Sequence, residues 1–211
     1  MLSDQEIRHA IQVMRQTFPN ASTTLEADST YHFLLATILS AQSTDKSVNQ
    51  VTPALFARYP QATDLAQASL DEVEPYIKQL GLYHNKAKFL VKCSQELVEH
   101  FGGQVPNTRK ELMTLSGVGR KVADVVLAEC FGIPAFAVDT HVSRVARRLG
   151  MVAPQATLLQ IEHRLMDAVP KEQWLDGHHS MIFWGRYQCT SRNPKCATCP
   201  LQSMCAFYHQ N

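Results

Sequence analysis

The chain has 211 residues, 45% of them hydrophobic and 18% charged, so it can bury a core and is not disordered. Its formal net charge of +1 excludes a strongly basic, histone-like binder, because any affinity for DNA must come from a local patch. The apolar stretches 33–39 and 122–128 are far shorter than the roughly 20 residues that cross a bilayer. We therefore expect no membrane contact and a cytoplasmic location.

Apolar residues recur at helical spacing along the chain, and no stretch alternates with the period of two that marks a half-buried strand. The predicted helices include the segments 4–18, 31–39, 122–130, 142–149 and 161–169. Glycine and proline separate the helical segments, and the turn Gly132-Ile133-Pro134 is the strongest candidate for a domain boundary. The sequence thus predicts an all-α fold of about ten helices.

A glycine-containing hairpin, Leu115-Ser116-Gly117-Val118-Gly119-Arg120-Lys121, lies between two predicted helices. Two glycines one residue apart permit a tight turn and leave backbone N–H groups exposed at the start of the next helix. Such groups bind an anion. Because the chain has no predicted strands, a dinucleotide-binding fold is excluded, and a nucleic-acid phosphate is the expected anion.

Four cysteines crowd the end of the chain, with the spacing Cys189-x6-Cys196-x2-Cys199-x5-Cys205. Persistent disulfides are not expected in a cytoplasmic protein, so we interpret the four thiols as metal ligands. Structural zinc usually takes two close cysteine pairs, whereas this uneven spacing favours a 4Fe-4S cluster. Zinc and free thiols are the alternatives.

The segment between the first two of these cysteines, 190–195, contains two cations, Arg192 and Lys195, and follows a third, Arg186. A loop fixed at both ends by metal bonds can present charge to phosphates at little entropic cost. The alternative is that these are ordinary solvated surface cations. No second cluster motif and no flavin or nucleotide fingerprint accompanies the cysteines, so a structural role of the metal is favoured over electron transfer.

Together these features resemble the helix-hairpin-helix DNA glycosylases, in particular the endonuclease III branch, whose hairpin reads close to L-P-G-V-G-R-K and whose cysteines have this spacing. The resemblance extends over nearly the whole chain through three further motifs: Ile38-Leu39-Ser40-Ala41-Gln42-Ser43-Thr44-Asp45, Gly81-Leu82-Tyr83 with Asn85-Lys86-Ala87, and Val138-Asp139-Thr140-His141. One departure is Ser116, where the family usually has proline. We expect this serine to loosen the hairpin slightly.

The resemblance implies two helical domains flanking a DNA-binding cleft. A six-helix barrel would cover 22–132, with its helix-hairpin-helix motif at about 108–128. An iron–sulfur cluster domain would combine 1–21 with 133–211. It also implies duplex DNA with damaged pyrimidines or abasic sites as the partner, a monomer, and association with the nucleoid of a prokaryote.

The implied activity is that of a bifunctional DNA glycosylase and abasic-site lyase acting on oxidised or ring-saturated pyrimidines. Lys121 would attack C1' and form a Schiff base, after which β-elimination cuts the strand on the 3' side. Asp139 would stabilise positive charge on the sugar and help to deprotonate the lysine. The plain alternatives are a solvent-facing lysine and an aspartate that caps the next helix.

In the same way, Gln42 would fill the void left by the flipped nucleotide and Leu82 would wedge the duplex. The alternatives are that Gln42 ends a helix and Leu82 packs in the core. His141 would contact a phosphate or cap its helix, whereas the pair His178-His179 is expected to pack or to lie at the surface and not to bind metal. The further expected DNA contacts are Gly117, Val118, Gly119, Arg120, Thr140, Arg186, Arg192 and Lys195. A monovalent cation would bind carbonyls of Met113, Leu115 and Val118.

Two other functions are compatible with parts of this pattern. A monofunctional glycosylase of the same family would excise a base without forming an imine, and its adenine-removing form lacks the hairpin lysine. A non-catalytic iron–sulfur module could bind DNA through the hairpin. That module would leave Lys121 together with Asp139 unexplained.

Overall fold

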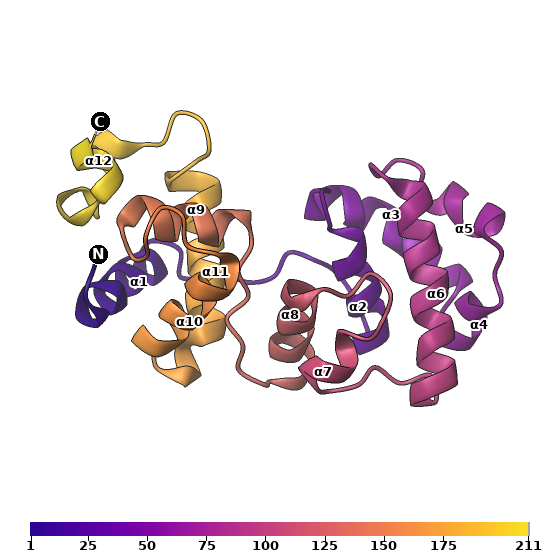
Figure 1. The fold of residues 1–211 in the computed structure, drawn as a ribbon. Coiled ribbons are helices and arrows are strands. Elements are labelled where there is room, and N and C mark those ends of the chain that lie inside the picture. The colour runs from indigo at the N-terminus through magenta and orange to yellow at the C-terminus, as the bar shows by residue number, and fades with distance from the viewer. Residues whose placement is uncertain (211) are drawn as a thin grey trace. The chain divides into compact units, whose positions relative to one another are not determined.

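The computed structural model describes residues 1–210, and this part of the chain contains helices and no strands, which confirms the all-α prediction. The α-helices are α1 (Asp4–Thr17), α2 (Thr30–Leu39), α3 (Asp45–Arg58), α4 (Ala62–Ala66), α5 (Leu70–Ile77), α6 (Tyr83–Phe101), α7 (Arg109–Leu112), α8 (Arg120–Phe131), α9 (Thr140–Leu149), α10 (Leu158–Ala168), α11 (Trp174–Phe183) and α12 (Ala206–Gln210) (Figure 1). No helix among these residues is long and apolar enough to cross a membrane.

The chain folds into two compact units. The continuous unit is Thr24–Ile133, and the two-segment unit combines Met1–Thr23 with 134–210. The second division falls within the Gly132-Ile133-Pro134 turn, where Gly132 ends α8 in the left-handed conformation.

The core of the continuous unit is built around α2. All residues from Tyr31 to Leu39 in this helix are buried. A helix that is apolar on every side needs neighbours all round, and α3, α6 and α8 pack against it (Figure 1). The two ends of the hairpin region, α7 and α8, pack against each other.

The two-segment unit brings the first helix of the chain against helices from its last third. Ile7, Ile11 and Met14 of α1 are buried in one cluster with residues of α9 and α10 and with Trp184. The cluster joins parts of the chain that are more than 130 residues apart in sequence.

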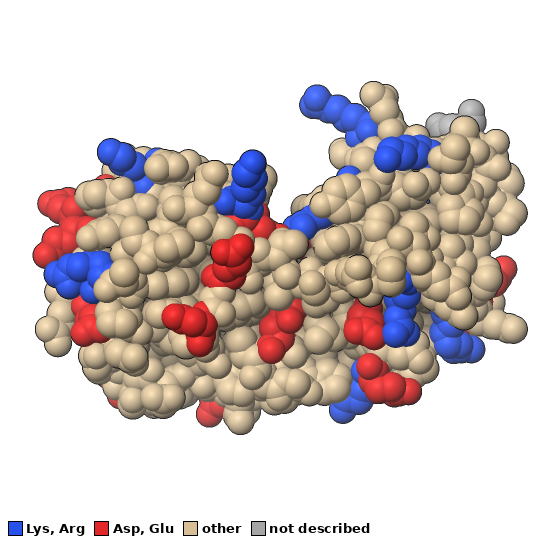
Figure 2. Space-filling model, turned by 180° about the vertical axis from the view of Figure 1, so that it is seen from behind, with Lys and Arg blue, Asp and Glu red and all other residues tan. Residues whose placement is uncertain are grey.

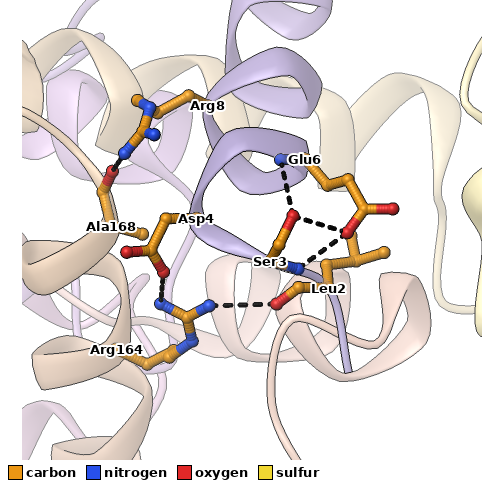
Figure 3. A network of polar contacts seen from close by, with 7 residues as sticks. All are labelled: Leu2, Ser3, Asp4, Glu6, Arg8, Arg164 and Ala168. Carbon is orange, nitrogen blue, oxygen red and sulfur yellow. Dashed lines mark hydrogen bonds and ion pairs between the residues drawn. The ribbon is translucent and has the colours of Figure 1, made fainter.

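Polar contacts fix the start of α1 (Figure 3). Ser3 and Glu6 form a reciprocal capping box, which satisfies backbone N–H groups at the helix start. Arg164 of α10 donates to Asp4 Oδ1 at 2.5 Å and to the Leu2 carbonyl at 2.9 Å. Arg8 donates to a carbonyl at the end of α10 at 2.7 Å. These bonds tie the first turns of α1 to the last turns of α10.

Candidate functional site

The two hairpin glycines differ in how strictly the structure requires a glycine. Gly117 has a φ of +80°, and a Cβ there would lie 3.0 Å from Phe89 Cβ and 3.1 Å from Ile38 Cγ2. It therefore needs glycine both for its backbone conformation and for its packing against α6 and α2. Gly119 caps α8 with an ordinary φ of −87°, and a Cβ there would have nothing within 4 Å. The space beside Gly119 is open.

Ser116 anchors the hairpin to α6, a contact that the expected loosening by serine did not take into account. Its backbone N–H donates to Glu96 Oε2 at 2.6 Å, and its hydroxyl donates to Glu96 Oε1 at 2.9 Å. A proline would lack the N–H and the hydroxyl, so it could make neither bond. Hydrogen bonds to a carboxylate are about twice as strong as neutral ones, and this pair fixes the hairpin to α6.

Lys121 is the second residue of α8 and is half-buried, so it is not the fully solvent-facing lysine of the plain alternative. Gly119, the N-cap of α8, makes no side-chain capping bond, and the start of a helix is where backbone N–H groups and the helix dipole favour an anion. Next to it, Arg120 opens the helix and Val118 is buried. The Leu115 carbonyl accepts the Val118 N–H at 3.1 Å, and Met113 is 45% exposed.

Asp139 caps α9. Its Oδ1 accepts the Val142 N–H at 2.8 Å, and its side chain is half-buried. The capping role expected from the sequence is confirmed, and it does not exclude a second role. His141 does not serve as the cap: its Nδ1 lies 3.2 Å from Arg144 Nη2. Burial lowers the pKa of His141, with Arg144 and Arg186 acting in the same direction and Asp139 opposing them. Thr140 is exposed.

Gln42 and Leu82 share an unusual backbone conformation. Their φ values are +55° and +60°, and no other non-glycine residue of the continuous unit has a positive φ. Leu82 caps α6 without a side-chain bond and is 56% exposed, so the alternative in which it packs in the core is wrong. Gln42 is exposed and lies two residues beyond Ser40, which caps α2, so it does not end that helix. Both positions carry backbone strain and an outward side chain.

All four cysteines line one cavity, together with Trp184, Gln188 and Phe207 among others. Among residues 1–210, no three His, Cys, Asp or Glu side chains are placed so that they could hold a single metal ion. Four ligands of one zinc ion would stand about 4 Å apart, since each Zn–S bond is about 2.3 Å. An arrangement around a cavity suits a larger cluster with one ligand for each iron.

Two arginines of α9 hold the first cysteine and the loop after it. Arg144 donates to the Cys189 carbonyl at 3.1 Å. Arg148 donates to the Thr190 carbonyl at 2.7 Å and lies 3.5 Å from Cys189 Sγ. These contacts restrain the start of the 190–195 loop.

The cations predicted to face phosphates are placed differently along this segment. Arg192 and Lys195 are exposed within the loop 190–195. Arg186 is half-buried in the π-helical turn Trp184–Gln188 that precedes the first cysteine. On the face drawn in Figure 2, acidic and basic side chains both occur, in keeping with the near-neutral net charge.

The pair His178-His179 is buried in α11, and His178 Nδ1 lies 2.8 Å from the Ala137 carbonyl. The packing role expected for this pair is confirmed. Sequence reasoning missed two other buried or half-buried polar groups, Lys86 and Glu96. The motif Gly81-Leu82-Tyr83 with Asn85-Lys86-Ala87 drew attention to the segment of the first, but a lysine one turn into a helix is usually exposed, so the motif did not reveal its burial. No local pattern marked the second.

The comparisons with known proteins agree with this geometry. Residues 35–171 match the family described as HhH-GPD superfamily base excision DNA repair protein, and residues 189–205 match the iron-sulfur binding domain of endonuclease III. The chain is 45% identical to endonuclease III of Bacillus subtilis over 205 residues. The aligned region covers 97% of this chain and 94% of that protein. The chain belongs to the endonuclease III family.

Endonuclease III of Escherichia coli K12 is 40% identical over 194 residues, which cover 92% of both chains. Among solved structures, a trapped covalent intermediate of endonuclease III with DNA aligns with a TM-score of 0.97 and 44% identity, covering 100% of this chain and 99% of that one. A thermostable thymine-DNA glycosylase shares the fold, with a TM-score of 0.89 at 21% identity over 99% of both chains. The iron–sulfur match starts at Cys189 and ends at Cys205, and the chain carries the 4Fe-4S cluster of this family.

Proposed function

We propose that this protein is a bifunctional DNA glycosylase and abasic-site lyase of base excision repair. Its substrates are oxidised or ring-saturated pyrimidines in duplex DNA, and it cuts 3' to the abasic site by β-elimination. One observation carries the proposal: a 44% identical endonuclease III has been trapped as a covalent intermediate with DNA, and this chain presents a half-buried lysine at the open start of its hairpin helix.

Lys121 is the proposed nucleophile. Its neutral amine attacks C1', the C1'–N bond to the base breaks, and the base leaves with the bonding electrons and takes up a proton. The amine nitrogen, having given up a proton, then pushes its lone pair toward C1', the C1'–O4' bond breaks as O4' takes up a proton, and the opened sugar carries an iminium. This iminium acidifies the C2' hydrogen, and loss of that proton expels the 3' phosphate. An ordinary lysine has a pKa of about 10.4, so neutral amine is scarce at neutral pH. Arg120 and the positive end of α8 both favour the neutral form.

Asp139 is the proposed carboxylate that stabilises positive charge on the sugar and helps to deprotonate the lysine. Because its carboxylate accepts the Val142 N–H, the capping role of Asp139 can be separated from the role of its charge by one substitution. Asparagine caps helices as well as aspartate does, so Asp139→Asn keeps the cap and removes the charge. We expect a strong loss of base excision with unchanged thermal unfolding. Wild-type turnover in this variant would remove Asp139 from the mechanism.

DNA binding is proposed to use the N–H groups of the hairpin and side chains around it. Gln42 fills the void in the duplex and Leu82 wedges it, and their exposure supports both roles. The proposed phosphate contacts are Gly117, Val118, Gly119, Arg120, Thr140, His141, Arg186, Arg192 and Lys195. Solvated surface cations remain the alternative for the last two, and the monovalent cation on the Met113, Leu115 and Val118 carbonyls stays a prediction.

Cys189, Cys196, Cys199 and Cys205 are the proposed ligands of the cluster. They line one cavity, and the loop between the first two is anchored by Arg148. The cluster would supply structural cross-links and no chemistry to base excision. We further propose that the protein acts as a monomer in the cytoplasm, at the nucleoid, as suits an enzyme whose relatives in bacteria are endonucleases III.

The test of the function is borohydride trapping on a duplex that contains thymine glycol, because reduction fixes only an imine between DNA and a protein amine. We expect a cross-link that maps to Lys121 and is absent from Lys121→Gln. Lys110→Gln, which removes an exposed lysine from α7, is the matched control and should cross-link like the wild type. Base release without a trapped adduct would indicate a monofunctional glycosylase. Neither release nor trapping on any lesion would favour a non-catalytic DNA-binding module.

A further inference from the structure

Lys86 is a buried cation close to the start of α6. It is 3% exposed, and its Nζ donates to the Ser43 hydroxyl at 2.6 Å. Burial lowers the pKa of Lys86, and no carboxylate of residues 1–210 offsets that effect. A buried ammonium without a counter-ion is costly, and apolar residues of similar size often replace buried charges with no loss of stability. Stability alone does not account for this lysine.

The bond of Lys86 joins two turns that are distant in sequence. Ser43 directly follows Gln42 in the turn after α2, which is closed by a bond from the Ser43 N–H to the Ser40 carbonyl at 3.1 Å. On the other side, the Lys86 N–H donates to the carbonyl of Leu82 at 3.0 Å. One residue thus contacts the neighbour of Gln42 through its side chain and Leu82 itself through its backbone.

Each of these turns holds its central residue in a strained left-handed conformation with an exposed side chain. Strain of this kind persists only where the surroundings over-determine the backbone. The Lys86–Ser43 bond provides such a restraint, since movement of either turn would leave the buried ammonium of Lys86 without this hydrogen-bond acceptor.

We propose that Lys86 is a positioning residue that holds Gln42 and Leu82 in fixed register, so that the void filler and the wedge enter the duplex together. The inference rests on the proposed function, in which these two side chains act on DNA. Lys86 touches neither the substrate nor the reacting atoms in this proposal. Its effect is confined to the geometry of the two turns.

Lys86→Met tests the proposal, because methionine retains an apolar side chain of similar length and removes the ammonium. Lys88→Met is the matched control, since it removes the same charge from an exposed position of α6. Two properties are measured at saturating protein: the single-turnover rate of thymine glycol excision, and the fluorescence change of 2-aminopurine opposite a tetrahydrofuran abasic analogue. The second reports insertion into the duplex without chemistry.

We expect Lys86→Met to lower the excision rate at least about tenfold, as displacement of a positioning group by an ångström can do. It should also reduce the fluorescence change, while its free energy of unfolding equals or exceeds that of the wild type. Lys88→Met should match the wild type in excision rate, in fluorescence change and in the free energy of unfolding. Unchanged excision in folded Lys86→Met would overturn the proposal. So would lower excision that comes with lower stability and an unchanged fluorescence response.

Ser43→Ala provides a second route if Lys86→Met does not fold. It removes the acceptor of the same bond and should lower excision and fluorescence in the same direction, and wild-type behaviour would again overturn the proposal. If the wild-type protein itself neither excises nor traps, the proposed function is wrong. The fluorescence response with the abasic analogue still decides for or against Lys86 in that case.

Discussion

The side chain at position 42 should support base excision, while its left-handed backbone conformation should lower the free energy of unfolding of the protein. A left-handed conformation costs a non-glycine residue about 1–2 kcal/mol, and glycine avoids that cost but loses about 0.5–1 kcal/mol through its greater freedom in the unfolded chain. Because the side chain is exposed, its removal costs little packing. Gln42→Gly should therefore raise the free energy of unfolding by about 0.5–1 kcal/mol, or the melting temperature by about 1–4 °C in a protein of this size.

Gln42→Ala is the control, because it removes the same side chain and keeps the strain. Both variants should lower thymine glycol excision, since neither can fill the void in the duplex. Only the glycine variant should be more stable than the wild type in urea unfolding. If alanine and glycine are equally stable, position 42 stores no strain. If both excise at the wild-type rate, Gln42 does not act on DNA.

Four further substitutions test the hairpin and the docking of α1. Gly117→Ala should lower the free energy of unfolding by about 2 kcal/mol or more, because the added Cβ meets both a positive φ and close contacts. Gly119→Ala should lower it by less than about 1 kcal/mol and should instead weaken binding to an abasic-analogue duplex. Urea unfolding and fluorescence anisotropy separate the two, and the reverse order would contradict the assignment. Ser116→Ala removes the hydroxyl bond to Glu96 and should lower the free energy of unfolding by about 1–2 kcal/mol. A double-mutant cycle with Glu96→Ala should give a coupling energy of the same size. Arg164→Ala should destabilise by about 1 kcal/mol in urea unfolding, and no change would show that its bonds to the start of α1 are not stabilising.

Most helical segments could be predicted because they bury one face at a regular spacing, which is a local property of the sequence. The same is true of Asp139 as a helix cap, since a capping side chain bonds to a backbone group three residues away. The four cysteines and Lys121 stood out through spacing and motif. All of these signals lie within a few residues of the feature that they predict.

The features that escaped prediction depend on partners far along the chain or on backbone torsion. Ser116 was expected to loosen the hairpin because its partner, Glu96, lies 20 residues earlier on another helix. The burial of Lys86 depends on a turn 43 residues away. Leu82 had a core alternative because leucine is usually buried, and no sequence pattern reveals a left-handed leucine that points outward.

The two-segment unit has a consequence for how the protein is made. Translation delivers 24–133 as one stretch, so this unit can fold while synthesis continues. Helix α1 leaves the ribosome before the continuous unit, yet the helices that bury Ile7 and Met14 follow more than 120 residues later. Its apolar face is exposed during that interval. Cys189, Cys196, Cys199 and Cys205 emerge later still, so the cluster can be inserted only after the whole continuous unit has been synthesised.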